Sequence, residues 1–289
     1  MAEGRTCACT GIRHCLKCEK KGGKVVSNYK TVVSCHLCGD IKQLTEIISC
    51  ERRLPLLQCI NTCKAKEVPV LTVKNTSLLN FETVTVHKEF LTDKEESQIV
   101  KEIDSYQWVA SQSGRHKQDF GPKVNFKRQK VKPGIFSGLP PFSQALVERV
   151  QKLVPGLADF FPVELCNLEY VPERGSAIDP HLDDSWLWGK RLITINLLSD
   201  TFLSFTSDTE QLLVPQPRRS LIVVSGSARH IWKHSINREH IVSRRLSITL
   251  RELSSIFLPG GEQEELGSEL LAIASSFAGK QCNGDTVLL

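Results

Sequence analysis

A series of short β-rich runs fills the C-terminal half of this 289-residue chain and narrows its fold class more than anything else in the sequence. Each run is dense in branched or aromatic residues, and clusters of Pro, Gly, Ser or Asp separate one run from the next. The runs are Val163–Val171, Arg191–Leu198, Leu221–Val224 and Arg245–Arg251. Strands of this length must pair into sheets and bury one face, so a sheet-based core is predicted.

Amphipathic helices are predicted on either side of these strands. Thr92 and Glu95 form a T-x-x-E capping box, and the apolar spacing that follows predicts a helix over residues 93–106. Similar spacing predicts helices over Ser143–Val154 and Glu264–Phe277. Helices followed by a run of short strands indicate an α+β fold with a double-stranded β-helix (jelly-roll) core and supporting helices.

Cysteines mark a boundary along the chain, because nine of the eleven lie before residue 64. The chain is long and begins without an apolar signal-peptide core, so we expect an intracellular, soluble protein with reduced thiols, in the cytoplasm, the nucleus or both. We expect residues 1–80 to be Cys-rich and irregular or partly disordered, residues 81–280 to be the folded domain, and residues 281–289 to be a flexible tail. Four thiols in the pattern C-x-C-x5-C-x2-C can close a zinc site, and a flexible reduced tail is the alternative. These thiols belong to Cys7, Cys9, Cys15 and Cys18.

Positive charge is concentrated in one segment, although the net charge of the chain is only +5. Between Gln112 and Lys132 seven basic residues stand against the single acid Asp119, and Phe120 and Phe126 are interleaved with them. Such a segment can contact phosphates and stack a flipped base, or hold an acidic protein, and a solvated surface is the alternative. The basic residues are Arg115, Lys117, Lys123, Lys127, Arg128, Lys130 and Lys132.

Two histidines and one carboxylate form a candidate metal site. In the H-x-D of His181 and Asp183 at the end of a strand, alternate residues share a face, so the imidazole and the carboxylate can meet at one ion. His234 follows the strand near Leu221–Val224, and His230 competes with it for the same role. Two histidines and one carboxylate are typical of non-haem iron(II) oxygenases, which need open positions for co-substrate and oxygen.

The last predicted strand indicates an anion site. Its alternation places Arg245, Ser247, Thr249 and Arg251 on one face, and we expect the apolar face to pack between the sheets. Two guanidinium groups in a cavity need an anion, and a dicarboxylate such as 2-oxoglutarate matches the planar fork of arginine.

In this order, these residues resemble the AlkB-type family of Fe(II)- and 2-oxoglutarate-dependent dioxygenases. The surrounding segments PVELCNLEYVPERGSAIDPHLDDSWLWG and SQSGRHKQDFGPKVNF resemble one branch, that of the fourth animal AlkB homologue. The resemblance covers about Phe81 to Phe277 plus Cys7–Cys18, whereas residues from about Glu19 to Asn80 depart from it. The matching positions are Asn167, Tyr170, His181, Asp183, His234, Arg245 and Arg251.

The resemblance implies an enzyme that oxidises an N-methyl group, which then leaves as formaldehyde, while 2-oxoglutarate and O₂ give succinate and CO₂. It implies that His181, Asp183 and His234 are the catalytic iron ligands. It also implies that 2-oxoglutarate binds Arg245 through its distal carboxylate, and Arg251 through its inner carboxylate or the iron-side network. Further hydrogen bonds to the co-substrate would come from Asn167 and Tyr170.

The resemblance also suggests substrates. The basic segment lies where the family carries a substrate lid, so Arg115, Lys117, Phe120, Lys123 and Phe126 are candidate lid residues. The branch is linked to removal of a methyl group from a lysine of actin, hence to actomyosin regulation and cytokinesis, and to N6-methyladenine in DNA, hence to chromatin. We expect methylated protein lysine, with N6-methyladenine DNA as the alternative. A non-catalytic metal-binding interaction scaffold is the alternative of another class.

Overall fold

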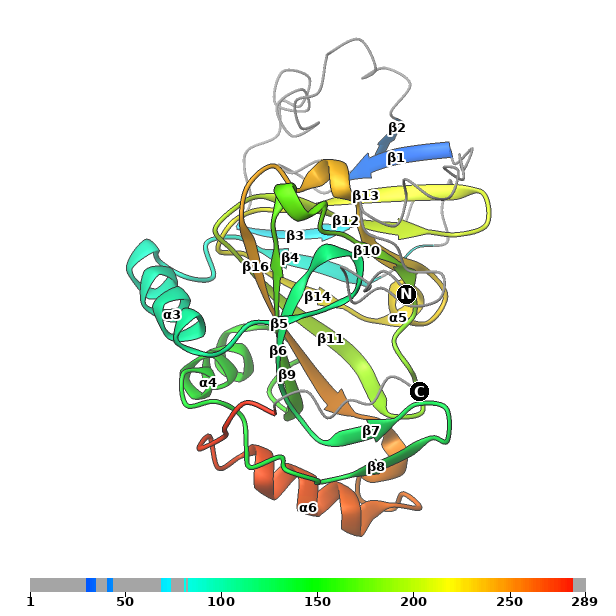
Figure 1. The fold of residues 1–289 in the computed structure, drawn as a ribbon. Helices are drawn as coiled ribbons and strands as arrows, with labels where there is room; N and C mark the ends of the chain where they lie inside the picture. The colour runs from blue at the N-terminus through cyan, green and yellow to red at the C-terminus, as the bar shows by residue number, and fades with distance from the viewer. Residues whose placement is uncertain (1–29, 35–40, 44–68, 74–80, 82, 283–289) are drawn as a thin grey trace, which may run out of the picture.

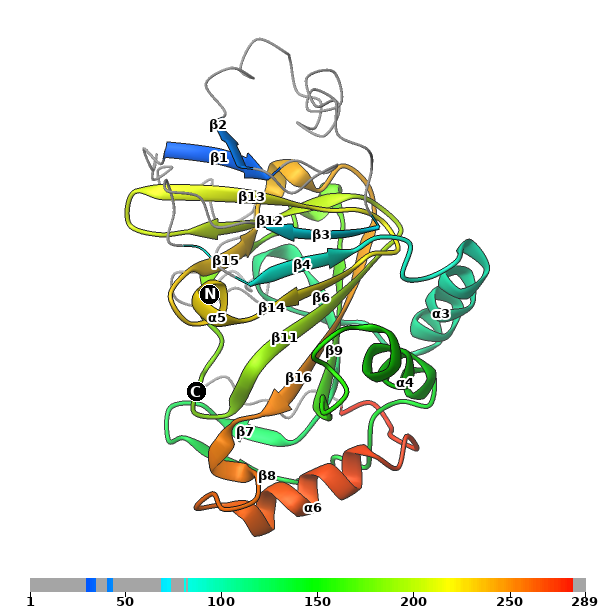
Figure 2. The same cartoon turned by 180° about the vertical axis from the view of Figure 1, so that it is seen from behind.

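Two β-sheets face each other in this computed structural model, which describes residues 30–34, 41–43, 69–73, 81 and 83–282 (Figure 1). Three of the four described helices gather on the outer side of the larger sheet, as the reverse view also shows (Figure 2). The helices are α3 (Asp93–Ser105), α4 (Ser143–Leu153), α5 (Gly226–His230) and α6 (Glu264–Ala274), with the short 3-10 turns η2 (Gln112–Gly114), η3 (Pro172–Arg174), η4 (Arg238–His240) and η5 (Ser255–Phe257).

The larger sheet is antiparallel, with the strand order β3-β4-β14-β11-β16-β9-β6-β5. Its strands are β3 (Val70–Val73), β4 (Val84–His87), β5 (Val109–Ala110), β6 (His116–Phe120), β9 (Pro162–Tyr170), β11 (Trp188–Leu197), β14 (Leu221–Val224) and β16 (Arg245–Leu253).

The smaller sheet has the order β10-β15-β12-β13-β1-β2, and its pairs are antiparallel except for the parallel pair of β1 and β13. A separate hairpin is formed by β7 (Lys123–Asn125) and β8 (Lys130–Lys132). The strands of the smaller sheet are β1 (Lys30–Ser34), β2 (Ile41–Gln43), β10 (Ile178–His181), β12 (Thr201–Thr206), β13 (Glu210–Gln216) and β15 (Lys233–Ile236).

The chain alternates between the two sheets from β9 to β16. Strands β9, β11, β14 and β16 lie in the larger sheet, and β10, β12, β13 and β15 lie in the smaller one, with only the β12–β13 hairpin staying in one sheet. This winding is the double-stranded β-helix, so the predicted α+β jelly-roll class is confirmed. It brings strands that are distant in the sequence to one central space between the sheets.

The predicted helices are confirmed. In the capping box of α3, the amide of Glu95 donates to Thr92 Oγ1 at 3.3 Å, and the amide of Thr92 donates to Glu95 Oε2 at 2.8 Å. Helices α4 and α6 begin at the predicted residues Ser143 and Glu264. Because these signals are local, the sequence alone places the helices well.

Two buried apolar clusters fix the layers. One lies between the larger sheet and helices α3, α4 and α6, and it includes Leu246, Ile248 and Leu250 of β16. The other lies between the sheets and includes Leu192 and Phe205. The apolar face of β16 was expected between the sheets, and this prediction is wrong, because that face packs on the helices and leaves the polar face toward the space between the sheets.

Residues before Phe81 contribute to both sheets. Strand β3 pairs with β4, and β1 pairs with β13, although both lie within the segment 1–80 predicted to be irregular. The amide of Cys282, at the start of the predicted flexible tail, donates to the carbonyl of Asp119 at 2.8 Å. None of the described helices combines the length and apolar character needed to cross a membrane. The zinc prediction for Cys7, Cys9, Cys15 and Cys18 lies outside the described residues.

Candidate metal centre and co-substrate pocket

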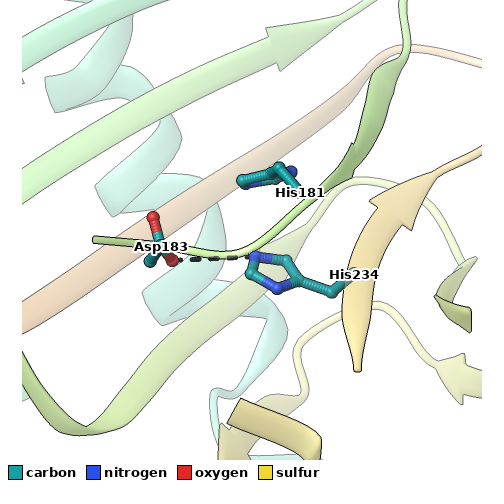
Figure 3. A group of neighbouring side chains, drawn as sticks. All are labelled: His181, Asp183 and His234. Carbon is teal, nitrogen blue, oxygen red and sulfur yellow. Dashed lines mark ion pairs between the residues drawn. The ribbon is translucent and has the colours of Figure 1, made fainter. Parts of the chain in front are cut away.

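Three side chains, two on paired strands and one on the loop after the first strand, converge at one point between the sheets (Figure 3). His181 ends β10 and lies directly opposite His234 of β15, so the imidazole centroids are 4.3 Å apart. Asp183 follows two residues after His181, and its Oδ2 lies 3.6 Å from His234 Nε2. One ligand atom from each residue lies within 4.8 Å of the others, which is close enough for all three to bind one ion.

Hydrogen bonding and burial prepare both histidines to bind a metal. Nδ1 of His181 lies 2.8 Å from the carbonyl oxygen of Asp179, which can only accept, so this nitrogen carries the proton and leaves the Nε2 lone pair available. Burial, followed by the charge of His181, lowers the pKa of His234 to about 3. The His234 imidazole is therefore neutral near pH 7, as a metal ligand must be.

The Asp183 carboxylate is held in its ionised form. Burial raises its pKa, but Arg251, His234, His181 and Arg229 together lower the pKa below that of an ordinary aspartate. Nη2 of Arg251 donates to Asp183 Oδ1 at 3.1 Å, which leaves Oδ2 on the side of the histidines. Two imidazoles and one carboxylate fit iron(II) and leave coordination positions for other ligands.

His230 is exposed on the short helix α5 and is not part of this group. The choice between His230 and His234 that the sequence leaves open therefore falls on His234. Near this group, Trp188 is buried below Arg251, whose Cζ lies 5.8 Å from the ring centroid.

The polar face of β16 lines a pocket between the sheets. Arg245, Ser247, Thr249 and Arg251 all face it, as their alternation predicts, and the metal group lies in the same pocket. Leucine and isoleucine side chains from both sheets complete the wall. The pocket therefore joins the candidate metal site to a row of polar groups.

Arg245 lies in this pocket without an acidic partner. It is 1% exposed, its Nε donates to Asn196 Oδ1 at 2.6 Å, its Nη2 donates to Gln216 Oε1 at 3.1 Å, and its Cζ lies 4.8 Å from the Tyr170 ring centroid. Within the described part of the chain, Arg245 Nη1 and Gln216 Nε2 are buried without hydrogen-bond partners. Two unsatisfied donors beside a buried cation fit the carboxylate of a co-substrate.

Arg251 differs from Arg245, because its guanidinium already forms ion pairs with two carboxylates. Nη1 donates to Glu164 Oε2 at 2.5 Å, and Nη2 donates to the metal-side carboxylate of Asp183. Of the two roles expected for Arg251, the structure supports the iron-side network.

Asn167 does not reach the pocket, although it was expected to bind the co-substrate. It is fully buried, and its Nδ2 donates to Gln118 Oε1 at 3.0 Å. Alternation along β9 places Asn167 on the helix side of the sheet, whereas Leu168 and Tyr170 line the pocket. Residues three apart on a strand face opposite sides, so the prediction is wrong for Asn167 and only Tyr170 of the pair is in place.

The predicted lid is only partly exposed. Phe120 is fully buried in the helix-side cluster, because strand β6 joins the larger sheet beside β9. Arg115, just before β6, is 5% exposed, and its Nε donates to the carbonyl of Gln112 at 3.2 Å. Lys117 Nζ pairs with Asp119 Oδ2 at 2.5 Å. Lys123 and Phe126 are exposed on the β7–β8 hairpin. A substrate contact is therefore contradicted for Phe120 and Arg115 and stays a prediction for the hairpin residues.

Sequence reasoning missed two amides that contact Arg245, Asn196 and Gln216, of which Gln216 lines the pocket. Both are buried on strands whose other residues are largely apolar, and both hold Arg245. For Asn196, a lone amide inside an apolar strand was the available signal, since such a group is buried only when it has hydrogen-bond partners. Gln216 ends a strand that also contains Gln211, so its sequence carries no such signal.

No protein-family model matches the chain. The chain is similar to two proteins named alpha-ketoglutarate-dependent dioxygenase alkB homolog 4. It is 42% identical to the Mus musculus protein over 306 residues, covering 95% of each chain, and 41% identical to the Homo sapiens protein over 308 residues, covering 96% of this chain and 95% of that one. It is also 35% identical to the DNA N6-methyl adenine demethylase of Caenorhabditis elegans over 283 residues, covering 94% of this chain and 95% of that one. Coverage this complete means that the alignment extends into the stretch 19–80.

Proposed function

Because the chain belongs to the AlkB-type 2-oxoglutarate-dependent dioxygenases, we propose that it oxidatively removes an N-methyl group, with iron(II) held by His181, Asp183 and His234. One observation supports this proposal most directly. The three metal-binding side chains share a pocket with Arg245, a buried cation that no acidic group among its described partners neutralises.

The residues of the pocket orient the reactants. When bound, iron(II) with 2-oxoglutarate and O₂ supplies the oxidising chemistry, which hydroxylates the methyl group so that it leaves as formaldehyde. Arg245 and Gln216 would hold the distal carboxylate of 2-oxoglutarate through Nη1 and Nε2, the two donors without partners. Tyr170 supports the Arg245 guanidinium with its ring, and the apolar walls limit the access of water.

The Asp183 carboxylate keeps its position through Arg251, which also contacts Glu164. His181 keeps its ring orientation through the hydrogen bond to Asp179, so its Nε2 lone pair has a fixed direction. These residues prepare the ligand set before a metal binds.

For the substrate, we propose methylated lysine in an acidic protein, with monomethyl-lysine of actin as the first candidate. The β7–β8 hairpin and its turn present exposed basic side chains, including Lys123, Lys127 and Lys130, that suit an acidic protein surface. Burial of Phe120 removes one of the two aromatic residues that would otherwise be available to stack a flipped base. Both observations support a protein substrate.

N6-methyladenine in DNA is the second candidate, favoured by the name of the Caenorhabditis elegans relative. The same basic hairpin can contact phosphates, and Phe126, which is 44% exposed, can stack on a base.

Parallel assays on a monomethyl-lysine actin peptide and an N6-methyladenine oligonucleotide test the substrate. We expect iron-dependent formaldehyde and demethylated peptide, with little turnover of the oligonucleotide. Turnover of the oligonucleotide alone would replace the protein substrate with DNA. A chain that forms no succinate with iron(II) and 2-oxoglutarate would be a non-catalytic scaffold.

A further inference from the structure

Arg229 is a buried arginine beside the metal group that the proposed chemistry does not use. It is 1% exposed on the five-residue helix α5, which lies between β14 and the strand that carries His234. Gly226 begins this helix with a φ of 55°, a backbone conformation that glycine adopts readily. Ala228 and Trp232 anchor this part of the chain in the cluster between the sheets.

The Arg229 guanidinium spans the two ends of the loop that carries the metal-binding carboxylate. Its Nη1 donates to the backbone carbonyl of Asp183 at 2.9 Å, and its Nη2 donates to the carbonyl of Trp188 at the longer distance of 3.4 Å. Between these points, the amides of Leu187 and Trp188 both donate to the carbonyl of Asp184, at 3.3 and 2.9 Å. The loop is therefore a compact turn held at both ends by one side chain.

A role in stability alone does not account for this placement. The hydrogen bonds described for Arg229 go to carbonyl oxygens and not to a carboxylate, and its Nε is buried without a partner in the described part of the chain. Burying a cation without a hydrogen-bonded carboxylate is unfavourable even with the Asp183 and Asp184 carboxylates nearby, and an apolar residue of similar volume is often neutral or stabilising in its place. The groups that benefit from the hydrogen bonds are the loop carbonyls, one of which belongs to a metal-binding residue.

We propose that Arg229 is a positioning residue for the metal site. Its side chain joins the Asp183 loop to helix α5, which precedes His234. It fixes the peptide that follows Asp183, and this fixes the direction of the Asp183 carboxylate toward the two imidazoles. The inference rests on the proposed function, since it concerns the same metal group.

The test uses Mn²⁺ alone as a redox-stable probe, with the free ion measured by electron paramagnetic resonance. The variants are Arg229→Met, which keeps the volume and removes the donors, and Arg229→Lys, which keeps the charge but has no planar fork. We expect the dissociation constant for Mn²⁺ to rise about 10–100-fold in Arg229→Met, as for other residues that orient metal ligands. Arg229→Lys should fall between Arg229→Met and the unaltered protein.

Amide hydrogen exchange gives a readout that stability alone would not change. In Arg229→Met without metal, the amides of Leu187 and Trp188 should exchange faster, while those of residues 192–197 of β11 and those of β16 should not. His230→Ala, one residue away and exposed, is the matched control and should bind Mn²⁺ normally.

An unchanged Mn²⁺ dissociation constant in folded Arg229→Met overturns the inference, and if that variant does not fold, an unchanged constant in Arg229→Lys does so. Faster exchange across the whole sheet in step with weaker binding also overturns it, because Arg229 would then act on stability. If the unaltered protein binds no Mn²⁺ at these residues, judged by comparison with Asp183→Ala, the proposed function fails together with the inference.

Discussion

At the scale of single residues, Arg245 and Gln216 define what the pocket can bind. Each has one buried donor without a partner among the described residues, and leaving such donors unsatisfied costs about 1–3 kcal/mol each, more for the charged group. A ligand that supplies two oxygens at this point removes that cost. The distal carboxylate of 2-oxoglutarate has the matching charge and geometry.

Substitution of these two residues should therefore weaken 2-oxoglutarate binding to different degrees. We expect Arg245→Met to raise the KM for 2-oxoglutarate about 100-fold or more, because a charged donor pair is lost, and Gln216→Leu to raise it about tenfold. Succinate formation at varied 2-oxoglutarate measures both. Gln211→Leu, on the same strand but outside the pocket, is the control. Equal KM values in all four proteins would exclude an anion site at Arg245.

At this scale, the sequence correctly predicts that the three candidate metal ligands lie together, and it predicts only part of the lining of the pocket beside them. H-x-D and the following histidine are specified by residue type, so His181, Asp183 and His234 were found without coordinates. The role of Asn167 depends on which side of β9 its side chain faces. The alternation of side chains along the strand places it on the helix side. Gln216 lies at the end of its strand, and its role appears only when β13 and β16 are seen to face the same pocket.

At the scale of secondary-structure elements, the two aromatic residues of the basic segment have different environments. Phe120, on strand β6, belongs to the core, and Phe126, beyond that strand, is exposed. Phe120 is fully buried and contacts Tyr106 edge-on with ring centroids 5.2 Å apart, whereas Phe126 lies in the turn between β7 and β8. Pairing of β6 with β9 along its whole length causes this difference.

Alanine substitutions should separate the two roles. We expect Phe120→Ala to lower the free energy of unfolding by about 3–5 kcal/mol, because a fully buried ring is lost. Phe126→Ala should change it by less than about 0.5 kcal/mol. Urea unfolding followed by circular dichroism measures both values. A small effect of Phe120→Ala would show that β6 is not held in the sheet.

Elements with local signals were predicted, and elements without them were not. The helices carry caps or apolar stripes, and the long strands of the larger sheet are continuous apolar or alternating runs. Strand β13 contains Pro215, which argues against a strand, and β15 is four residues long with Lys233 and His234 at its start. Both pair with β12, so they are fixed by tertiary contacts and not by their own composition.

At the scale of the whole molecule, the two sheets enclose the metal group and the β7–β8 hairpin presents basic side chains outside them. If the hairpin recruits an acidic substrate, charge reversal with Lys123→Glu and Lys130→Glu should raise the KM for the substrate about tenfold at low salt, and the difference should shrink as salt rises. Succinate formation without substrate should not change, because the hairpin residues do not line the pocket. A KM that changes neither with the charge reversal nor with salt would show that the hairpin is a solvated surface that does not contact the substrate.

The most direct test of the account is anaerobic addition of iron(II) and 2-oxoglutarate to the purified chain, followed by the visible metal-to-ligand absorption of the chelate. We predict a band that saturates near one equivalent of iron in the unaltered protein and is lost in folded His181→Ala, Asp183→Ala and His234→Ala. In Arg245→Met, the band should require more 2-oxoglutarate. A folded, unaltered chain without the band, or three ligand variants that keep it, would contradict a metal site at these residues.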